Sequence, residues 1–88
     1  MVEREIRVTN TLGVHARPAS KIVQTANRYR SKISLLRGKL SADAKSILNV
    51  MMLGANYDSS VTVRASGDDE KDAADAIAAL FEQKFNEE

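Results

Sequence analysis

The segment from Gly13 to Ser20 (Gly-Val-His-Ala-Arg-Pro-Ala-Ser) holds the side chains with the clearest chemical potential in this 88-residue sequence. It contains the single histidine of the chain, His15, and the single proline, Pro18, with Arg17 between them. A neutral imidazole is available near pH 7 as a nucleophile that can take up a phosphoryl group and pass it on. A helical pattern follows at once, so His15 falls at or beside a helix N-terminus, where free N–H groups favour anions. We therefore predict a phosphoryl group on His15, with charge-assisted hydrogen bonds from Arg17.

Ser46 is the second candidate, because it directly precedes a short apolar run. An ordinary helix N-cap, worth about 0.5–2 kcal/mol, is the simpler interpretation of this serine. A phosphate at Ser46 would be tolerated by the helix N-terminus, yet it would place charge beside apolar side chains. Ile47, Leu48, Met51 and Met52 are too many apolar residues for a short helix to bury easily, which favours a partly exposed patch that contains Met51 or Met52. The alternative is that all four pack inward.

The composition excludes several classes of site. The chain has no cysteine, which excludes disulfides, zinc ribbons and thiol catalysis, and a single histidine argues against a transition-metal centre. We expect neither a metal nor a cofactor. The residues from Met1 to Glu5 contain no apolar run, so we expect no signal peptide, no membrane insertion and a soluble, cytoplasmic setting. With 43% hydrophobic and 28% charged residues, the chain is typical of one globular domain over residues 1–88.

Charge is distributed unevenly along the chain. Residues 1–45 contain ten Lys or Arg and three Asp or Glu, whereas residues 46–88 contain three and nine, so formal charges of +7 and −6 give the net +1. This asymmetry favours a basic face for an acidic partner or a phosphate; ordinary charged helix surfaces are the alternative.

Two hydrophobic periodicities define the expected elements. Alternation predicts strands over 2–8, 32–37, 39–43 and 60–65, with Gly38 in a hairpin turn. Helical spacing predicts helices over 16–28 and 47–53, the second closed by Gly54, and a third that starts at residues 67–70 and runs toward the C-terminus. The resulting fold class is α+β: an open-faced two-layer β-α-β-β-α-β-α sandwich, with a four-stranded antiparallel sheet and three helices on one face. The residues expected to face inward are Val2, Ile6, Val8, Ala19, Ile22, Val23, Ala26, Ile33, Leu35, Leu40, Ala42, Val61, Val63, Ala65, Ala73, Ala74, Ile77, Leu80, Phe81 and Phe85.

Three segments together resemble the HPr family, the histidine-containing phosphocarrier proteins of the phosphoenolpyruvate-dependent phosphotransferase system. Residues 13–20 resemble the active-site motif of that family, with Val14 where leucine is usual. Residues 45–47 with Val50 and Met51 resemble its regulatory-serine motif, and residues 67–70 resemble the start of its last helix. The resemblance covers essentially the whole chain.

The resemblance implies a carrier of phosphoryl groups rather than a stand-alone enzyme. In this role His15 would accept phosphate on Nδ1 from enzyme I and pass it to an enzyme IIA, assisted by Arg17, and Ser46 would be phosphorylated by an ATP-dependent HPr kinase/phosphorylase. The chain is expected to act as a monomer. Asn49 stands where the family commonly has glycine, which leaves the geometry of the short helix open. The implied partner surface comprises Ala16, Arg17, Ser20, Lys21, Gln24, Asn27, Ile47, Leu48 and Met51.

Other functions remain alternatives at this point. A nitrogen-related branch shares the histidine motif, so sugar transport does not follow from the motif alone. A regulatory protein that docks through Ser46, with His15 incidental, is a second alternative. A basic α/β sandwich also suggests RNA binding, but the chain lacks a stacking-aromatic run and a KH-type glycine loop, so no nucleic-acid partner is expected.

Overall fold

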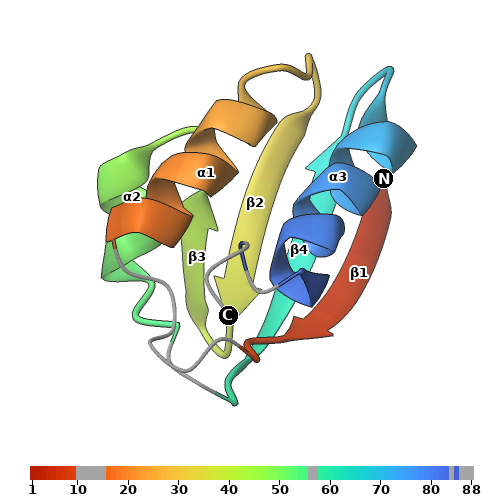
Figure 1. Ribbon diagram of the computed structural model, residues 1–88. Coiled ribbons are helices and arrows are strands. Elements are labelled where there is room, and N and C mark those ends of the chain that lie inside the picture. Colours follow the sequence, from red (N-terminus) through yellow and green to blue (C-terminus); the bar gives the residue numbers. More distant parts are fainter. Residues whose placement is uncertain (10–15, 56–57, 84, 86–88) are drawn as a thin grey trace.

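The computed structural model describes residues 1–9, 16–55, 58–83 and 85, which form seven elements in the expected order (Figure 1). The four strands form one open antiparallel sheet, and the helices complete a two-layer sandwich, as the sequence predicted. The elements are β1 (Val2–Arg7), α1 (Ala16–Ala26), β2 (Lys32–Arg37), β3 (Leu40–Asp43), α2 (Ile47–Met52), β4 (Ser60–Ser66) and α3 (Glu70–Glu82).

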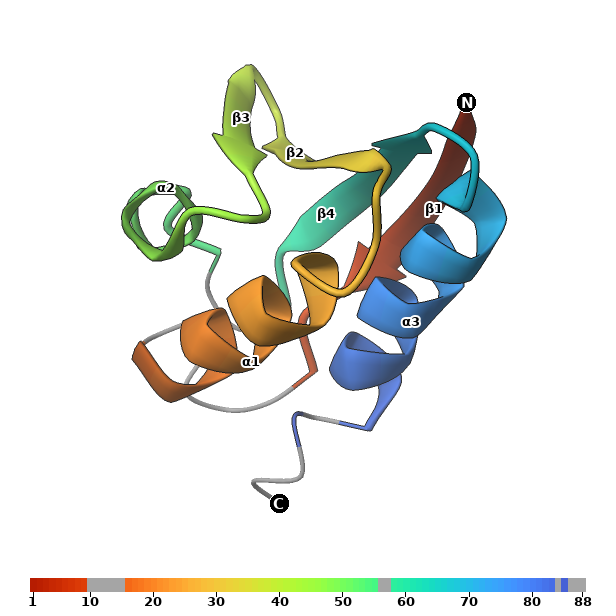
Figure 2. The same ribbon diagram turned by 90° about the horizontal axis from the view of Figure 1, so that it is seen from above.

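The sheet has the strand order β1-β4-β2-β3, and every neighbouring pair is antiparallel. The last strand of the chain therefore lies inside the sheet, between the first strand and the second. Helices α1 and α3 cover one face, α2 lies beside α1 next to β3, and the opposite face is open (Figures 1 and 2). This arrangement places α1 and α2 side by side at one end of the helical layer.

The core forms where the alternating strand residues meet the apolar sides of α1 and α3. Val61, Val63 and Ala65 of β4 are buried, as are Ile33 and Leu35 of β2, so the alternation assigned their face correctly. On β1, the long side chain of Arg4 lies on the same face, and its Nε donates to Asp75 of α3 at 3.2 Å. The charged end thus reaches solvent while the stem lies along apolar surface.

Two inward positions differ from the expectation. Leu40 shares the inner face with Ala42 but is 49% exposed, because it pairs with Arg37 at the hairpin end of the edge strand β3, beyond the helical cover. Phe85 is fully buried, as expected, but it lies outside the helix. Helix α3 ends at Glu82, and Phe85 has a φ of +57°, so the chain turns back and packs this ring edge-to-face on Phe81 at 4.8 Å between centroids.

The start of α3 is tied to the turn that follows α1. Asp69 precedes the helix, yet its carboxylate makes no capping bond; it accepts from the backbone N–H groups of Arg30 and Ser31, each at 2.9 Å, and from Ser31 Oγ at 2.5 Å. These hydrogen bonds, with that of the hydroxyl the strongest, lower the pKa of Asp69 from 3.8 to about 2. Gly67 lies against the same serine: a Cβ built on Gly67 would stand 2.8 Å from Ser31 Cα.

Candidate functional site

Helix α1 begins at Ala16, the residue that follows His15 in the sequence. His15 itself lies outside the described residues. Pro18 is buried in the first turn, where a missing N–H leaves no intrahelical partner unsatisfied. No acidic side chain occupies that turn, and within the described chain the exposed Arg17 has no hydrogen bond or ion pair. The N-terminus of α1 thus combines free backbone donors with an unpaired guanidinium, which is an arrangement that favours an anion.

The predicted polar face of α1 divides into two parts. Ala16, Arg17, Gln24 and Asn27 are exposed, as a partner surface requires. Lys21 is half-buried instead, and its ammonium group donates to the backbone carbonyl of Phe85. This side chain therefore holds the segment after α3 against α1, a structural role that the sequence did not indicate. Ser20 is also half-buried and accepts from Gln24 Nε2 at 3.4 Å.

Ser46 is the N-cap of α2, with extended backbone angles and a half-buried side chain. Its Oγ accepts from the backbone N–H of Asn49 at 3.3 Å and from Asn49 Nδ2 at 3.1 Å. The first bond is the ordinary cap that the sequence favoured, and the second is specific to asparagine. The helix forms from Ile47 to Met52 with asparagine in the third position, and this side chain adds a donor to the serine that glycine would lack.

Neighbouring segments fix α2 at both ends. Before the helix, Lys45 Nζ donates at 2.8 Å to the carbonyl of Tyr29, which follows α1. After the helix, Arg37 Nε donates at 2.9 Å to the carbonyl of Leu53, and Gly54 follows with a φ of +68°, as expected for a left-handed C-cap. Because Tyr29 and Arg37 belong to different parts of the fold, α2 is fixed against both α1 and the sheet.

The outer side of α2 is apolar and open to solvent, whereas Val50 is the buried residue of this helix. The predicted partly exposed patch therefore exists, and it is larger than expected because it contains both methionines. Leu40 of β3 adjoins it through a hollow of about 240 Å³ that it lines with Met52 and Leu53. We call this surface the α2 apolar face; its residues and exposed fractions are Leu40 49%, Ile47 44%, Leu48 65%, Met51 43% and Met52 73%.

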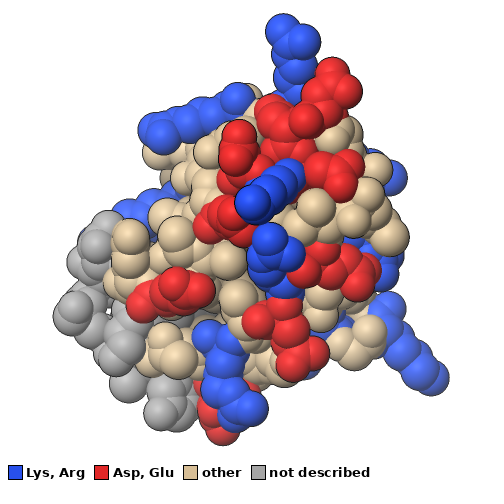
Figure 3. Space-filling view, turned by 90° about the vertical axis from the view of Figure 1, so that its right-hand side faces the viewer, with Lys and Arg blue, Asp and Glu red and all other residues tan. Residues whose placement is uncertain are grey.

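The opposite side of the molecule carries most of the negative charge. Figure 3, which views the α3 side, shows Asp and Glu gathered over this helix with a few Lys and Arg between them. The acidic residues of α3 and its approach are Asp68, Asp69, Glu70, Asp72, Asp75 and Glu82. Arg17 and Lys45 lie in or next to α1 and α2, whereas Arg4 of β1 binds Asp75 of α3, so the basic residues of the first half of the chain are not confined to one side of the fold.

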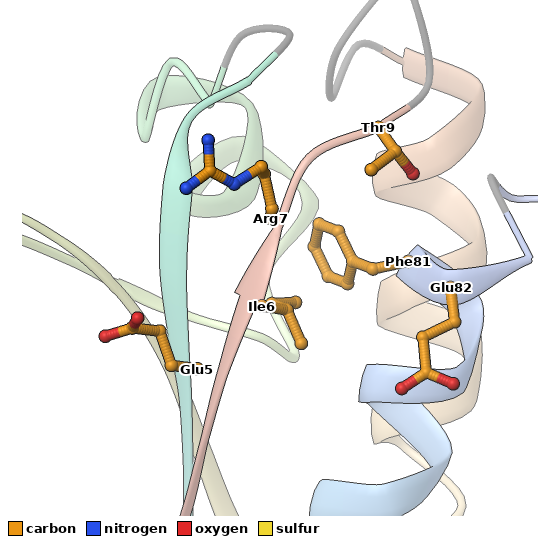
Figure 4. A pocket seen from close by; sticks show the side chains of 6 residues that line it. All are labelled: Glu5, Ile6, Arg7, Thr9, Phe81 and Glu82. Carbon is orange, nitrogen blue, oxygen red and sulfur yellow. The ribbon is translucent and has the colours of Figure 1, made fainter.

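A separate hollow of about 360 Å³ lies between β1 and the end of α3. Ile6 and Phe81 point toward each other inside it, whereas Glu5 and Arg7 leave the strand on the other side (Figure 4). Arg7 is paired with Asp58 at 2.9 Å, and that pairing raises the pKa of the arginine. The polar residues Thr9 and Glu82 also line this hollow, but none of its lining residues belongs to α1 or α2, so we assign the candidate site to α1 and α2 instead.

Met52 lies in the exposed patch in which the sequence analysis placed Met51 or Met52. Two other residues of the site region were not found from the sequence. Leu40 extends the α2 apolar face but was assigned to the core. Asn49 was noted only as a departure from the usual residue, although it binds Ser46. No helix in the described part of the chain has the length and apolar character needed to cross a bilayer.

Comparisons with known proteins agree with this geometry. The family described as "PTS HPr component phosphorylation site" matches residues 2–83. The phosphocarrier protein HPr of Treponema pallidum is 48% identical over 88 residues, which span the whole of both chains. The phosphocarrier protein NPr of Proteus mirabilis is 41% identical over 86 residues, 97% of this chain and 96% of that protein.

A solved structure gives the same result for the fold. The crystal structure of HPr from Thermoanaerobacter tengcongensis superposes with a TM-score of 0.95 at 42% identity, covering 100% of this chain and 99% of that one. Matches of this extent cover every element from β1 to α3 together with both candidate motifs. The chain therefore belongs to the HPr family of phosphocarrier proteins of the phosphotransferase system.

Proposed function

We propose that His15 is the group that carries the phosphoryl unit, accepting it from phosphorylated enzyme I and passing it to an enzyme IIA in the cytoplasm. The observation that carries this proposal is the start of α1 immediately after His15 in the chain, with an exposed, unpaired Arg17 in its first turn. A dianionic phosphoryl group near this helix end would be stabilised by roughly 0.3–2 kcal/mol through the helix dipole. The guanidinium of Arg17 would add charge-assisted hydrogen bonds.

In the proposed transfer, neutral His15 attacks phosphorus through Nδ1. The new P–N bond forms as the bond between phosphorus and the donor group breaks, so no oxidation or reduction takes place. The reverse exchange with the acceptor regenerates the free imidazole. Ala16 and Arg17, which follow His15 in the sequence, are exposed, so we infer that the partner proteins supply the remaining groups that surround the transferring phosphoryl unit.

We assign docking of these partners to the exposed residues of α1 together with the α2 apolar face. An exposed cluster of large apolar side chains is typical of an interaction site, and Met51 and Met52 can repack against different partners. Arg17 and Gln24 give this surface a polar and basic border. We propose that the chain acts as a monomer, which leaves this surface open to donor and acceptor in turn; sedimentation analysis would test the oligomeric state.

Incubation with enzyme I and radiolabelled phosphoenolpyruvate tests the proposal. The expected product is an acid-labile, base-stable phosphate that is absent from His15→Ala and present in Ser46→Ala. Arg17→Glu should slow the transfer while the melting temperature stays within about 2 °C of the parent, because Arg17 is exposed. Full labelling of His15→Ala would contradict the proposal, and a large loss of melting temperature in Arg17→Glu would make this arginine structural.

We further propose that Ser46 is a regulatory site for an HPr kinase/phosphorylase. A phosphate on this N-cap would be accepted by the start of α2, yet it would stand beside Ile47 and Leu48 of the α2 apolar face and weaken docking. Ser46→Asp should therefore raise the KM for enzyme I with the fold intact. Unchanged transfer kinetics together with an unchanged circular dichroism spectrum would contradict this role.

The similarity to an NPr makes a nitrogen-related carrier the second candidate. The two candidates share the proposed chemistry at His15 and differ in the proteins that bind the α2 apolar face. Comparing transfer rates from a sugar-type and a nitrogen-type enzyme I distinguishes them, since the cognate donor should have the higher kcat/KM.

A further inference from the structure

Four polar side chains form a compact group on the open face of the sheet. In the antiparallel pairing of β2 with β4, Lys32 lies opposite Ser66, and Ser34 lies opposite Arg64. Directly opposed residues share a face, as do residues two apart on one strand, so the four side chains form a square. Their neighbours in the two strands, such as Ile33 and Ala65, point into the core, which places the square on the side away from the helices (Figure 2).

Most of the hydrogen-bonding capacity of this square is unused. Within the described chain, Lys32 has no hydrogen bond or ion pair, and the hydroxyl groups of Ser34 and Ser66 have no partner. Arg64 is bound at one point only: its Nε donates to Glu3 Oε2 at 2.6 Å. This pair leaves the two terminal nitrogens of the guanidinium available and holds its plane in place.

The square and Met1 together line a hollow of about 290 Å³. The volume is close to the lower end of the range for small-molecule sites in proteins. The N-terminal ammonium of Met1 is paired with Glu70 Oε2 at 2.7 Å, so the cationic groups that remain for a ligand are those of Lys32 and Arg64. The hollow therefore presents two cations and two hydroxyl groups to a ligand of small size.

We propose that this hollow is a binding site for a small, free phosphate monoester. A terminal phosphate has three acceptor oxygens, which match the guanidinium nitrogens, the ammonium group of Lys32 and the serine hydroxyls. The carboxylate of Glu3 opposes an anion, and both cations are exposed, so we expect a dissociation constant on the order of 1–10 mM. The site lies on the face opposite to α1, which makes it independent of the transfer proposed at His15 (Figure 2).

Titration of the ¹⁵N-labelled protein with glycerol 3-phosphate at constant ionic strength tests the site. We expect saturable shifts of the backbone amides of β2 and β4 around the square, and none with glycerol alone. Lys32→Gln should weaken binding about fivefold, the equivalent of losing one exposed charge contact. The matched control, Lys39→Gln in the exposed β2–β3 turn, removes the same charge elsewhere and should change the dissociation constant less than about twofold.

His15→Ala separates this site from the carrier site, because the shifts in β2 and β4 should remain unchanged in that variant. Shifts that rise linearly without saturation would overturn the proposal. Equal weakening by Lys32→Gln and Lys39→Gln would also overturn it, since it would show general attraction to a basic protein rather than a built site.

Discussion

Replacement of Gly67 by alanine tests the closest approach between two segments of the fold. Gly67 has a φ of +150°, and an added Cβ would stand 2.7 Å from Ser31 Oγ and 2.8 Å from Ser31 Cα. Ordinary carbon contacts lie near 3.5–4.0 Å, so the alanine methyl would overlap both atoms. One of them belongs to the backbone, and the turn that contains Ser31 cannot yield without losing its hydrogen bonds to Asp69.

Three contributions determine the loss of stability. The unfavourable φ costs about 1–3 kcal/mol, and overpacking costs about 1–3 kcal/mol. Alanine also reduces the conformational freedom of the unfolded chain, which offsets about 0.4–1 kcal/mol of this loss. We therefore expect Gly67→Ala to lower the free energy of unfolding by about 2–4 kcal/mol. For a domain of this size, that is a fall in melting temperature of at least about 10 °C.

Gly38→Ala is the matched control. Gly38 also has a positive φ, +59°, but an added Cβ would have no atom within 4 Å. The left-handed conformation costs about 1–2 kcal/mol, partly offset by the unfolded state, so the expected loss is about 1 kcal/mol or less. The difference between the two variants contains the clash with Ser31 together with the difference in backbone cost between a φ of +150° and one of +59°.

Urea unfolding followed by circular dichroism measures both variants, and NMR titration of Asp69 adds a local readout. The clash should move Ser31 away from Asp69, so the pKa of this carboxyl group should rise from about 2 toward its ordinary value in Gly67→Ala only. Equal destabilisation of Gly67→Ala and Gly38→Ala, with an unchanged Asp69 pKa, would refute the reasoning.

Three further predictions concern acid stability and α2. The folded-state pKa of Asp69 is below its unfolded value, so its contribution to the free energy of unfolding is complete above about pH 4 and is lost as the pH falls toward 2. Asp69→Asn should therefore weaken the fall in stability between pH 4 and pH 2, measured by urea unfolding from pH 7 to 2. An unchanged dependence on pH in this range would contradict the assignment. Leu48→Ala should change the free energy of unfolding by less than about 0.5 kcal/mol yet raise the KM for enzyme I, because Leu48 is exposed. Val50 is buried on the same helix, so Val50→Ala should lower the free energy of unfolding by about 1.5–3 kcal/mol. A larger loss of stability in Leu48→Ala than in Val50→Ala, measured by thermal unfolding, would show that the buried and exposed faces of α2 are misassigned. Asn49→Gly removes the side-chain hydrogen bond to Ser46 and places glycine within a helix, so it should lower the free energy of unfolding by about 1 kcal/mol. The same change should speed the phosphorylation of Ser46 by a kinase, because the hydroxyl group loses a partner. Slower phosphorylation would mean that Asn49 positions the serine for the kinase rather than restrains it.

Local periodicity was sufficient to predict the order of the elements and most of the core. Alternation identified the buried face of β4, and helical spacing identified Ala19, Ile22 and Ala26 on α1, because one dominant burial face repeats along each element. The same periodicity does not show where the covering layer ends. Leu40 has the correct face and is nevertheless half exposed, because β3 is the edge strand.

Local hydrophobic periodicity does not predict contacts between distant parts of the chain. The third helix was expected to start at residues 67–70, but nothing in the pattern indicated that the carboxylate of Asp69 binds the turn after α1. Lys21 was expected on the partner surface, but it reaches Phe85, which packs only because the chain leaves the helical path after Glu82. In the candidate site, the sequence identified the exposed α2 residues and Ser46, whereas the bond from Asn49 depends on a side-chain rotamer; the prediction for His15 lies outside the described residues.

The position of β4 in the sheet has a consequence for the order in which the protein can fold. Among the described strands, β1 pairs with β4 alone, and the Arg64–Glu3 pair joins residues 61 positions apart. During synthesis the first strand therefore leaves the ribosome long before its partner exists, and the apolar side chains of β1 have no sheet to join. Because loop closure must precede these contacts, the pairing of β1 with β4 should be a late step, and a chain arrested before β4 should bind chaperones through its exposed N-terminal strand.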